Sequence, residues 1–80
     1  MRVYRLTTHA EDQMRHRKIA ENFVRQVVNA PDQFSPDYSQ KSYCLVKRFG
    51  TRLLKVWVLP PWPPAGGGAE IVVKSAAWKD

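Results

Sequence analysis

Two β-prone segments separated by Gly50 and Thr51 constrain the fold more than any other feature of the sequence. Residues 42–49 and 52–59 are rich in strand-forming residues, and a two-residue loop between such segments predicts a β-hairpin. Counting outward from this loop assigns each residue to one of two faces. The more apolar face, which we expect to pack under helices, carries Tyr43, Leu45, Lys47, Leu54, Val56 and Val58. The other carries Cys44, Val46, Arg48, Leu53, Lys55 and Trp57. A three-residue loop would change this pairing of faces.

Two helices are predicted before the hairpin. Thr8 and Glu11 fit a capping box, with Thr8 as the N-cap of the first helix and Glu11 at position N3. The second helix is predicted over about residues 20–30, where apolar residues follow helical spacing. Ala20 is a poor N-cap, but Ile19 and Val24 have the spacing of a hydrophobic staple around the start of this helix.

Short strands are predicted outside the hairpin. Residues 2–7 alternate well enough for a first strand, and residues 33–38 form a short edge strand interrupted by a proline. After a loop rich in proline and glycine at 60–68, residues 70–78 form the last strand. The predicted fold is therefore α+β in the order β-α-α-β-β-β-β, a single domain over residues 1–80. We expect two N-terminal helices on one face of a four- or five-stranded antiparallel sheet.

The positive charge is concentrated in the second half of the chain. Thirteen Lys and Arg against seven Asp and Glu give a net charge of +6 on 80 residues. Residues 1–40 contain six basic and five acidic residues (net +1), and residues 41–80 contain seven and two (net +5). Such a balance points to an anionic partner, and the positive field must come mainly from the second half.

Several classes of protein are excluded by the same composition. No apolar segment is long enough for a transmembrane helix, and the first residues lack the apolar core of a signal peptide. Cys44 is the only cysteine, so it cannot form an internal disulfide, and we expect a cytoplasmic protein. With two histidines beside it, the chain cannot close a zinc site by itself, and it has no phosphate-binding loop. We therefore expect no metal, no cofactor and no membrane partner.

Basic and aromatic side chains share the hairpin face that we expect to remain uncovered. On such a face cations can hold phosphates while rings stack on the bases of a single strand. The alternative is that Lys and Arg only blunt an exposed sheet and keep a small protein soluble. The absence of acidic residues from 41 to 69 supports nucleic-acid binding by the set as a whole. The candidate nucleic-acid-binding residues are Arg48, Arg52, Lys55, Trp57 and Lys74.

His9 is the candidate for proton transfer, because an imidazole titrates near neutral pH. Metal-free RNA cleavage needs a base for the 2′-hydroxyl, an acid for the leaving 5′-oxygen and cations for the phosphorane. Arg17, Arg48, Lys55 and Lys74 can supply the cations. The candidate catalytic residues are His9, Arg17, Lys55 and Lys74. The alternative is that His9 only forms a local hydrogen bond at the start of its helix.

Three other residues have side chains that could act in catalysis or binding, but their sequence surroundings favour a structural role. His16 lies among basic residues and is expected to be an exposed residue at a helix end. Cys44 has no nearby feature that would lower its pKa, so we expect a packed or half-exposed strand residue. Trp62 lies among prolines and could stack on a base or act as a polyproline ligand, but we expect it to fold back on the domain.

The pattern His9-Ala10-x-x-x-Met14-x-x-Arg17-x-Ile19 resembles that of a bacterial family of domains of unknown function grouped with RelE/ParE-like toxins. The resemblance covers nearly the whole chain. It implies a barnase/colicin/RelE-type fold and, more weakly, a ribonuclease toxin of a toxin–antitoxin pair. His9 and Arg17 match the polar positions of the motif, and the other three residues match its core positions.

Two residues depart from that family pattern, and neither departure touches the proposed chemistry. Lys18 stands where the family has a glycine, so the turn between the helices must form without the freedom of glycine at positive φ. Ala20 stands where the family has a polar N-cap.

Three hypotheses remain open at this point. The first is a metal-independent ribonuclease toxin acting on RNA, including mRNA on the ribosome, with a cognate antitoxin as a further partner. The second is a non-catalytic module that uses the same basic face to bind nucleic acid or an acidic protein segment. The third is a ParE-like toxin that acts by protein contact with gyrase.

Overall fold

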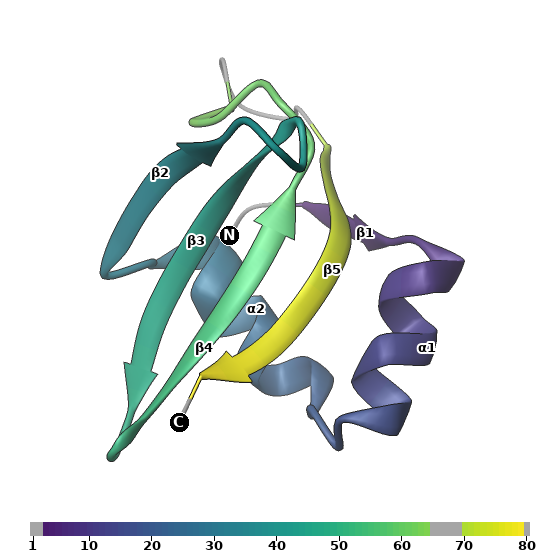
Figure 1. The fold of residues 1–80 in the computed structure, drawn as a ribbon, viewed down its shortest axis with the longest axis vertical. Helices are drawn as coiled ribbons and strands as arrows, with labels where there is room; N and C mark the ends of the chain where they lie inside the picture. The colour runs from purple at the N-terminus through teal and green to yellow at the C-terminus, as the bar shows by residue number, and fades with distance from the viewer. Residues whose placement is uncertain (1–2, 65–69, 80) are drawn as a thin grey trace.

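The order of elements is β-α-α-β-β-β-β, as predicted (Figure 1). The computed structural model describes residues 3–64 and 70–79. The described helices are α1 (Thr8–His16) and α2 (Glu21–Asn29). The described strands are β1 (Tyr4–Leu6), β2 (Gln33–Asp37), β3 (Ser42–Phe49), β4 (Arg52–Val58) and β5 (Ile71–Lys79). Residue 2 of the predicted first strand and the glycine-rich part of the predicted 60–68 loop lie outside the described residues. Neither of these two helices is long and apolar enough to cross a membrane.

The strands form one mixed sheet in the order β1-β5-β4-β3-β2. The pairs β2/β3, β3/β4 and β4/β5 are antiparallel, and β2 lies at the edge, as predicted. β1 pairs with β5 in the parallel direction, with Tyr4 opposite Ile71, which corrects the expectation of a wholly antiparallel sheet. Most of the chain lies between these two strands, so no tight turn dictates their relative direction.

The β3–β4 hairpin has the predicted two-residue loop and register. Phe49 pairs with Arg52, and the seven pairs end with Tyr43 opposite Val58. Gly50 has a φ of 64°, the left-handed conformation that a tight hairpin turn requires and that glycine adopts at little cost. The predicted division of the hairpin into two faces is therefore confirmed.

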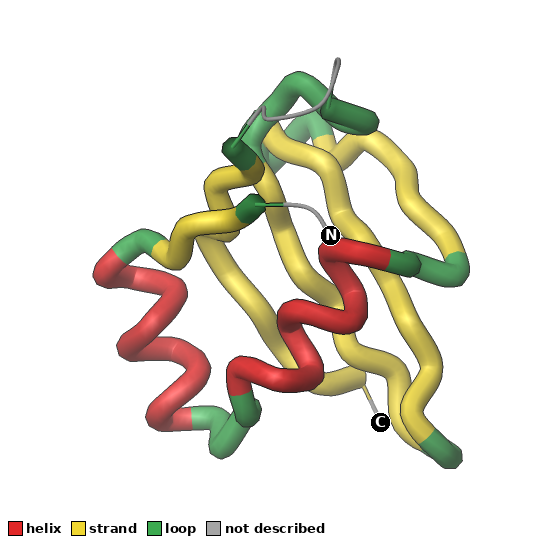
Figure 2. Tube along the Cα trace, turned by 180° about the vertical axis from the view of Figure 1, so that it is seen from behind, coloured by secondary structure: helices red, strands yellow, loops and turns green. Residues whose placement is uncertain are grey.

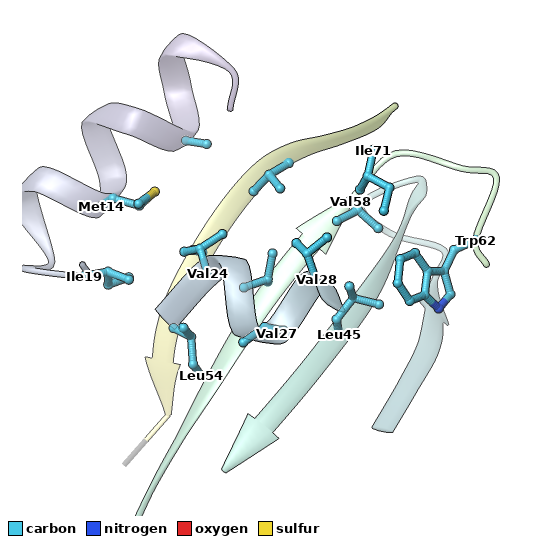
Figure 3. Close-up of a cluster of buried hydrophobic side chains, with 14 residues drawn as sticks. Met14, Ile19, Val24, Val27, Val28, Leu45, Leu54, Val58, Trp62 and Ile71 are labelled. Atoms are coloured by element: carbon cyan, nitrogen blue, oxygen red, sulfur yellow. The ribbon is translucent and has the colours of Figure 1, made fainter. Parts of the chain in front are cut away.

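The core lies between α2 and one face of the sheet (Figure 3). Leu45, Leu54, Val56 and Val58 of the hairpin are fully buried. From α2 the fully buried residues are Val24, Val27 and Val28. Ile19 and Val24 belong to the same buried cluster, as the predicted staple requires. Trp62 is also buried and packs edge-on against Phe34, so it folds back on the domain as expected. We call this side of the sheet the helix face and the opposite side the open face.

Helix α1 begins one residue earlier than the capping-box pattern predicts. Thr7, not Thr8, is the N-cap, and its Oγ1 accepts a hydrogen bond of 3.1 Å from the backbone N–H of Ala10. Either threonine could supply this hydroxyl, and pairing of β1 with β5 leaves Thr7 at the end of the strand, where its N–H donates to the carbonyl of Val73. His9 is consequently the second helical residue, and Glu11 is not at position N3.

The turn after α1 forms without glycine. Lys18 takes a φ of 55°, a left-handed conformation that costs a non-glycine residue roughly 1–2 kcal/mol. The N–H of Ile19 donates to the carbonyl of Met14 at 2.8 Å, and that of Lys18 donates to Arg15 at 3.4 Å. These two hydrogen bonds define a Schellman motif. Burial of Ile19, the residue after Lys18, compensates the strain of the left-handed conformation at Lys18.

α1 lies at the side of the sheet rather than over its centre. Figures 1 and 2 both show α2 across one face and α1 beside β5, next to β1. The apolar residues Ala10 and Met14 of α1 join the core. β1 pairs only with Ile71–Val73, so α1 flanks the part of β5 that continues beyond β1. The polar side of α1 therefore reaches the open face.

Candidate functional site

An open cavity of about 270 Å³ lies between α1 and the open face of the sheet. We call it the α1 cavity. It is lined by His9, Gln13, Arg17, Gln40, Trp57, Lys74, Ser75 and Ala77. These residues come from α1 and its C-cap, the β2–β3 turn, β4 and β5, so the site exists only in the folded chain.

Helical spacing places three of these side chains in one line. His9, Gln13 and Arg17 are separated by four residues each, and residues at this spacing lie on the same side of a helix. Ala10 and Met14, one position further along in each turn, point into the core. Each turn of α1 thus contributes one anchor to the core and one polar side chain to the cavity.

A β-bulge in β5 presents two successive residues to the cavity. Trp57 pairs with Ser75, but the next residue of β4, Val58, pairs with Val73, so Lys74 is the extra residue. In a regular strand Lys74 and Ser75 would point to opposite faces. Here both line the cavity, and Lys74 Nζ donates a hydrogen bond of 2.7 Å to the carbonyl oxygen of Gln40.

The indole of Trp57 is held in place by Asp37. Trp57 Nε1 donates to Asp37 Oδ2 at 2.9 Å, from β4 across to β2. The hydroxyl of Ser39 donates to Asp37 Oδ1 at 2.8 Å. The Ser39 hydrogen bond, followed by that of Trp57, lowers the pKa of Asp37 below its ordinary value. The carboxylate therefore stays ionised and fixes one wall of the α1 cavity.

Two contacts join α1 to β5 at the floor of the site. Arg17 Nη1 donates a hydrogen bond of 2.7 Å to the carbonyl oxygen of Ala76. The hydroxyl of Ser75 donates a hydrogen bond to Gln13 Oε1. Because Arg17 and Gln13 also line the cavity, the contacts that hold the helix shape the site as well.

The charge of the α1 cavity is positive. Arg17 and Lys74 are permanent cations near neutral pH, and His9 can add a third positive charge when protonated. No acidic residue is among the described residues that line it. Within the part of the chain that the structure describes, no cluster of three or more His, Cys, Asp or Glu could hold a metal ion. This arrangement suits an anion with a flat apolar group beside it.

The structure brings together part of the predicted site. His9, Arg17 and Lys74 of the candidate catalytic set line the α1 cavity, together with Trp57 of the candidate binding set. Lys55 lies outside the lining of the cavity, although its pairing with Val46 places it on the open face as predicted.

Arg48 and Arg52 lie further away, towards the hairpin loop. Arg48 pairs with Leu53 on the open face, and its backbone N–H donates to Asp32. Arg52 is on the helix face, where its guanidinium lies 4.3 Å from the centre of the Trp78 ring. Arg52 opposes Phe49 and is two residues from buried Leu54, so strand alternation separates it from the face of Arg48, Lys55 and Trp57.

Sequence reasoning selected Trp57 but missed the polar uncharged members of the site, Gln13, Gln40 and Ser75. Gln13 could have been found, because it lies midway between His9 and Arg17 on the helix. Gln40 and Ser75 have no comparable signal, since the turn and the bulge that place them are set by tertiary structure.

Two of the residues considered for other chemistry behave as expected. Burial raises the pKa of the Cys44 thiol, which disfavours the nucleophilic thiolate. His16 is exposed at the end of α1, where its Nδ1 lies 2.9 Å from the carbonyl oxygen of Asp12.

No family model, curated protein or solved structure matches this chain. The function must therefore be argued from the site itself.

Proposed function

We propose that the chain is a metal-independent endoribonuclease of the toxin type, with the α1 cavity as its active site. The observation that carries this proposal is the convergence of His9, Arg17 and Lys74 on one cavity that also contains an aromatic ring. Lys74 lies far from His9 and Arg17 in the sequence, and each of the three supplies a group that phosphodiester cleavage requires. Trp57 adds a surface on which a base can stack.

His9 is the group that moves protons in this mechanism. It removes the proton of the 2′-hydroxyl, whose oxygen attacks the adjacent phosphorus. The bond from phosphorus to the 5′-oxygen breaks, which leaves a 2′,3′-cyclic phosphate and a 5′-hydroxyl end. The leaving oxygen takes its proton from the imidazolium, and the histidine returns to its neutral form.

Arg17 and Lys74 stabilise the charge that develops on the phosphorane. A positioned cation next to the reacting phosphate lowers the barrier because its interaction strengthens as negative charge accumulates. Arg17 is held towards β5 by the Ala76 carbonyl, and Lys74 is held by the Gln40 carbonyl. Both guanidinium and ammonium groups have further N–H donors for phosphate oxygens. Lys55 and Arg48 extend the positive surface on the open face and would contact more distant phosphates.

The decisive experiment is RNA cleavage in the presence of EDTA. We expect cleavage by the native chain and a loss of about 10²–10⁴-fold in His9→Gln, the range for removal of a general acid–base. His16→Gln is the matched control, since it lies on the same helix outside the α1 cavity. Equal activity of the two variants, or cleavage that EDTA abolishes, contradicts the proposal. Growth arrest on expression of the native chain, relieved by His9→Gln, tests the toxin assignment.

A non-catalytic nucleic-acid-binding module is the second candidate. Lys55 and Arg48 favour it, because they lie on the open face outside the cavity and have no part in the chemistry. In that case RNA binds, no cleavage occurs, and His9→Gln binds RNA as well as the native chain does.

A further inference from the structure

A second cavity, of about 320 Å³, adjoins the same β2–β3 turn. We call it the turn cavity. It is lined by Pro36, Asp37, Tyr38, Lys41, Ser42, Tyr43 and Pro60. The side chains of two tyrosines and two prolines make its wall largely flat and apolar. None of its residues belongs to the lining of the α1 cavity, so nothing in the proposed chemistry accounts for it.

The two cavities share the β2–β3 turn as a common wall. Asp37 lines the turn cavity and holds Trp57, which lines the α1 cavity. Gln40 lines the α1 cavity, and its neighbour Lys41 lines the turn cavity. Because both cavities adjoin this turn, an RNA strand with a phosphate in one cavity can reach the other across the turn.

Ser42 supplies an independent indication of a ligand. Only 5% of this residue is exposed, and its Oγ has no hydrogen-bond partner among residues 3–64 and 70–79. A buried hydroxyl without a partner costs free energy, and native proteins rarely leave one in that state without a reason. Because Ser42 lines the turn cavity, a different χ1 rotamer can present the hydroxyl to a bound polar group.

The exposed ring of Tyr38 is a second indication of a ligand, because it takes no part in the core. Its side chain belongs to the turn, and 86% of the residue is exposed. Aromatic rings exposed beside a basic surface are the platforms on which proteins stack the bases of single strands. Lys41 and Asp37 lie in the same lining, so one cation and one carboxylate flank the ring.

We propose that the turn cavity binds one nucleobase of the RNA strand whose scissile phosphate lies in the α1 cavity. This inference rests on the proposed function and adds a base-recognition subsite to it. Tyr38 and Tyr43 contact the faces of the base, and the Ser42 hydroxyl hydrogen-bonds its polar edge. A base offers a flat apolar surface with hydrogen-bonding groups at its rim, which matches the aromatic and proline walls and the single buried hydroxyl. The turn cavity then recognises the identity of the base next to the cleavage site.

The first test compares short oligonucleotides whose 2′-hydroxyls are methylated, so that they bind without being cleaved. One oligonucleotide is a tetranucleotide that carries all four bases, and each of the others lacks the base at one position. We expect one abasic position to weaken binding roughly five- to hundredfold, the range for loss of one base–aromatic stack. Tyr38→Ala should weaken binding of the full oligonucleotide to the same extent and remove the penalty of that abasic position. Phe34→Ala, an exposed aromatic residue on β2 outside both cavities, is the control. Equal binding of base-bearing and abasic oligonucleotides overturns the proposal.

The second test separates this inference from the proposed function. Free nucleoside monophosphates are titrated into the labelled protein and followed by NMR, which requires no cleavage. We expect shifts of the amide signals of Lys41 and Ser42, and weaker binding by Ser42→Ala at a thermal stability equal to or higher than that of the native chain, because the substitution removes a buried hydroxyl without a partner. Shifts without any RNA cleavage would refute the catalytic proposal and leave the base site intact. Cleavage without these shifts, or shifts given by a proline-rich peptide and not by nucleotides, would overturn the base site alone.

Discussion

Replacement of Arg17 by glutamine tests whether the polar side of α1 both secures the helix and forms the site. Arg17 Nη1 donates a hydrogen bond of 2.7 Å to the carbonyl oxygen of Ala76. Ala76 is fully buried, so this carbonyl would lose its donor without becoming freely hydrated. Glutamine is shorter than arginine and uncharged, and it cannot restore the same contact.

The magnitude follows from the cost of removing a donor from a buried acceptor. Loss of one such partner costs about 1–3 kcal/mol. Because Arg17 itself is exposed and water can reach part of the contact, we expect a value near the lower end, about 1.5 kcal/mol. A domain of this size loses roughly 4–8 °C in Tm for each kcal/mol, so Tm should fall by about 6–12 °C. If Arg17 also holds an RNA phosphate, the slope of log K against log salt should fall by about 0.7, the value for one contact to a single strand.

The assay pairs thermal unfolding with RNA binding over a range of salt concentrations, for Arg17→Gln and Arg25→Gln. Arg25 is exposed on α2 and is absent from the linings of the α1 and turn cavities, and its replacement changes the net charge by the same amount. We expect Arg25→Gln to leave Tm nearly unchanged and to reduce the salt slope less than Arg17→Gln does. Equal Tm values for the two variants would refute the role of Arg17 in securing α1. Equal salt slopes would refute its contact with phosphate.

Three further predictions concern stability, acid sensitivity and thiol reactivity. Leu54→Ala removes a fully buried side chain and should cost about 2–5 kcal/mol, measured as a lower urea midpoint at unchanged m-value; an equal loss in Leu53→Ala, on the open face, would contradict this. Asp37 has a folded pKa below its ordinary 3.8, so its contribution to stability is fully present above that pH and is lost as pH falls through the folded pKa. The decrease in Tm on acidification should therefore shrink in Asp37→Asn, and an unchanged profile would show that other carboxylates account for it. Burial raises the pKa of the Cys44 thiol, so alkylation by iodoacetamide at pH 8, followed by mass spectrometry, should be slower in the native protein than in urea. Equal rates would show that the thiol is accessible and unperturbed.

The hairpin and its two faces could be predicted from the sequence because a two-residue loop leaves a single register. Once Gly50 and Thr51 form the loop, Phe49 must oppose Arg52, and strand alternation assigns every other side chain. Helix α2 could be predicted for a similar reason, since its apolar positions repeat at the helical period and the staple residues mark its start. Both elements are determined by residues close together in the chain.

The parallel pairing of β1 with β5 could not be predicted in this way. No residue near Tyr4 or Ile71 encodes the direction of a partner from the other end of the chain. The same limit applies to the α1 cavity. His9, Arg17 and Lys74 could be selected by residue type, but their convergence depends on α1 lying beside β5 and on the bulge at Lys74. Lys55 has equally suitable chemistry and lies outside the lining, because no bulge or helix brings it there.

The short length of β1 explains why the candidate site lies where it does. β1 pairs with only three residues of β5, Ile71–Val73, and the bulged residue Lys74 follows at once. A longer β1 would occupy the edge of β5 next to Ala76, where Arg17 now donates its hydrogen bond. α1 could not then approach the open face, and the line of His9, Gln13 and Arg17 would be separated from Lys74 and Trp57. The early end of β1 thus leaves the β5 edge to a helix instead of a strand. Because that helix carries both core residues and polar residues, the contacts that complete the fold also bring the candidate catalytic groups together.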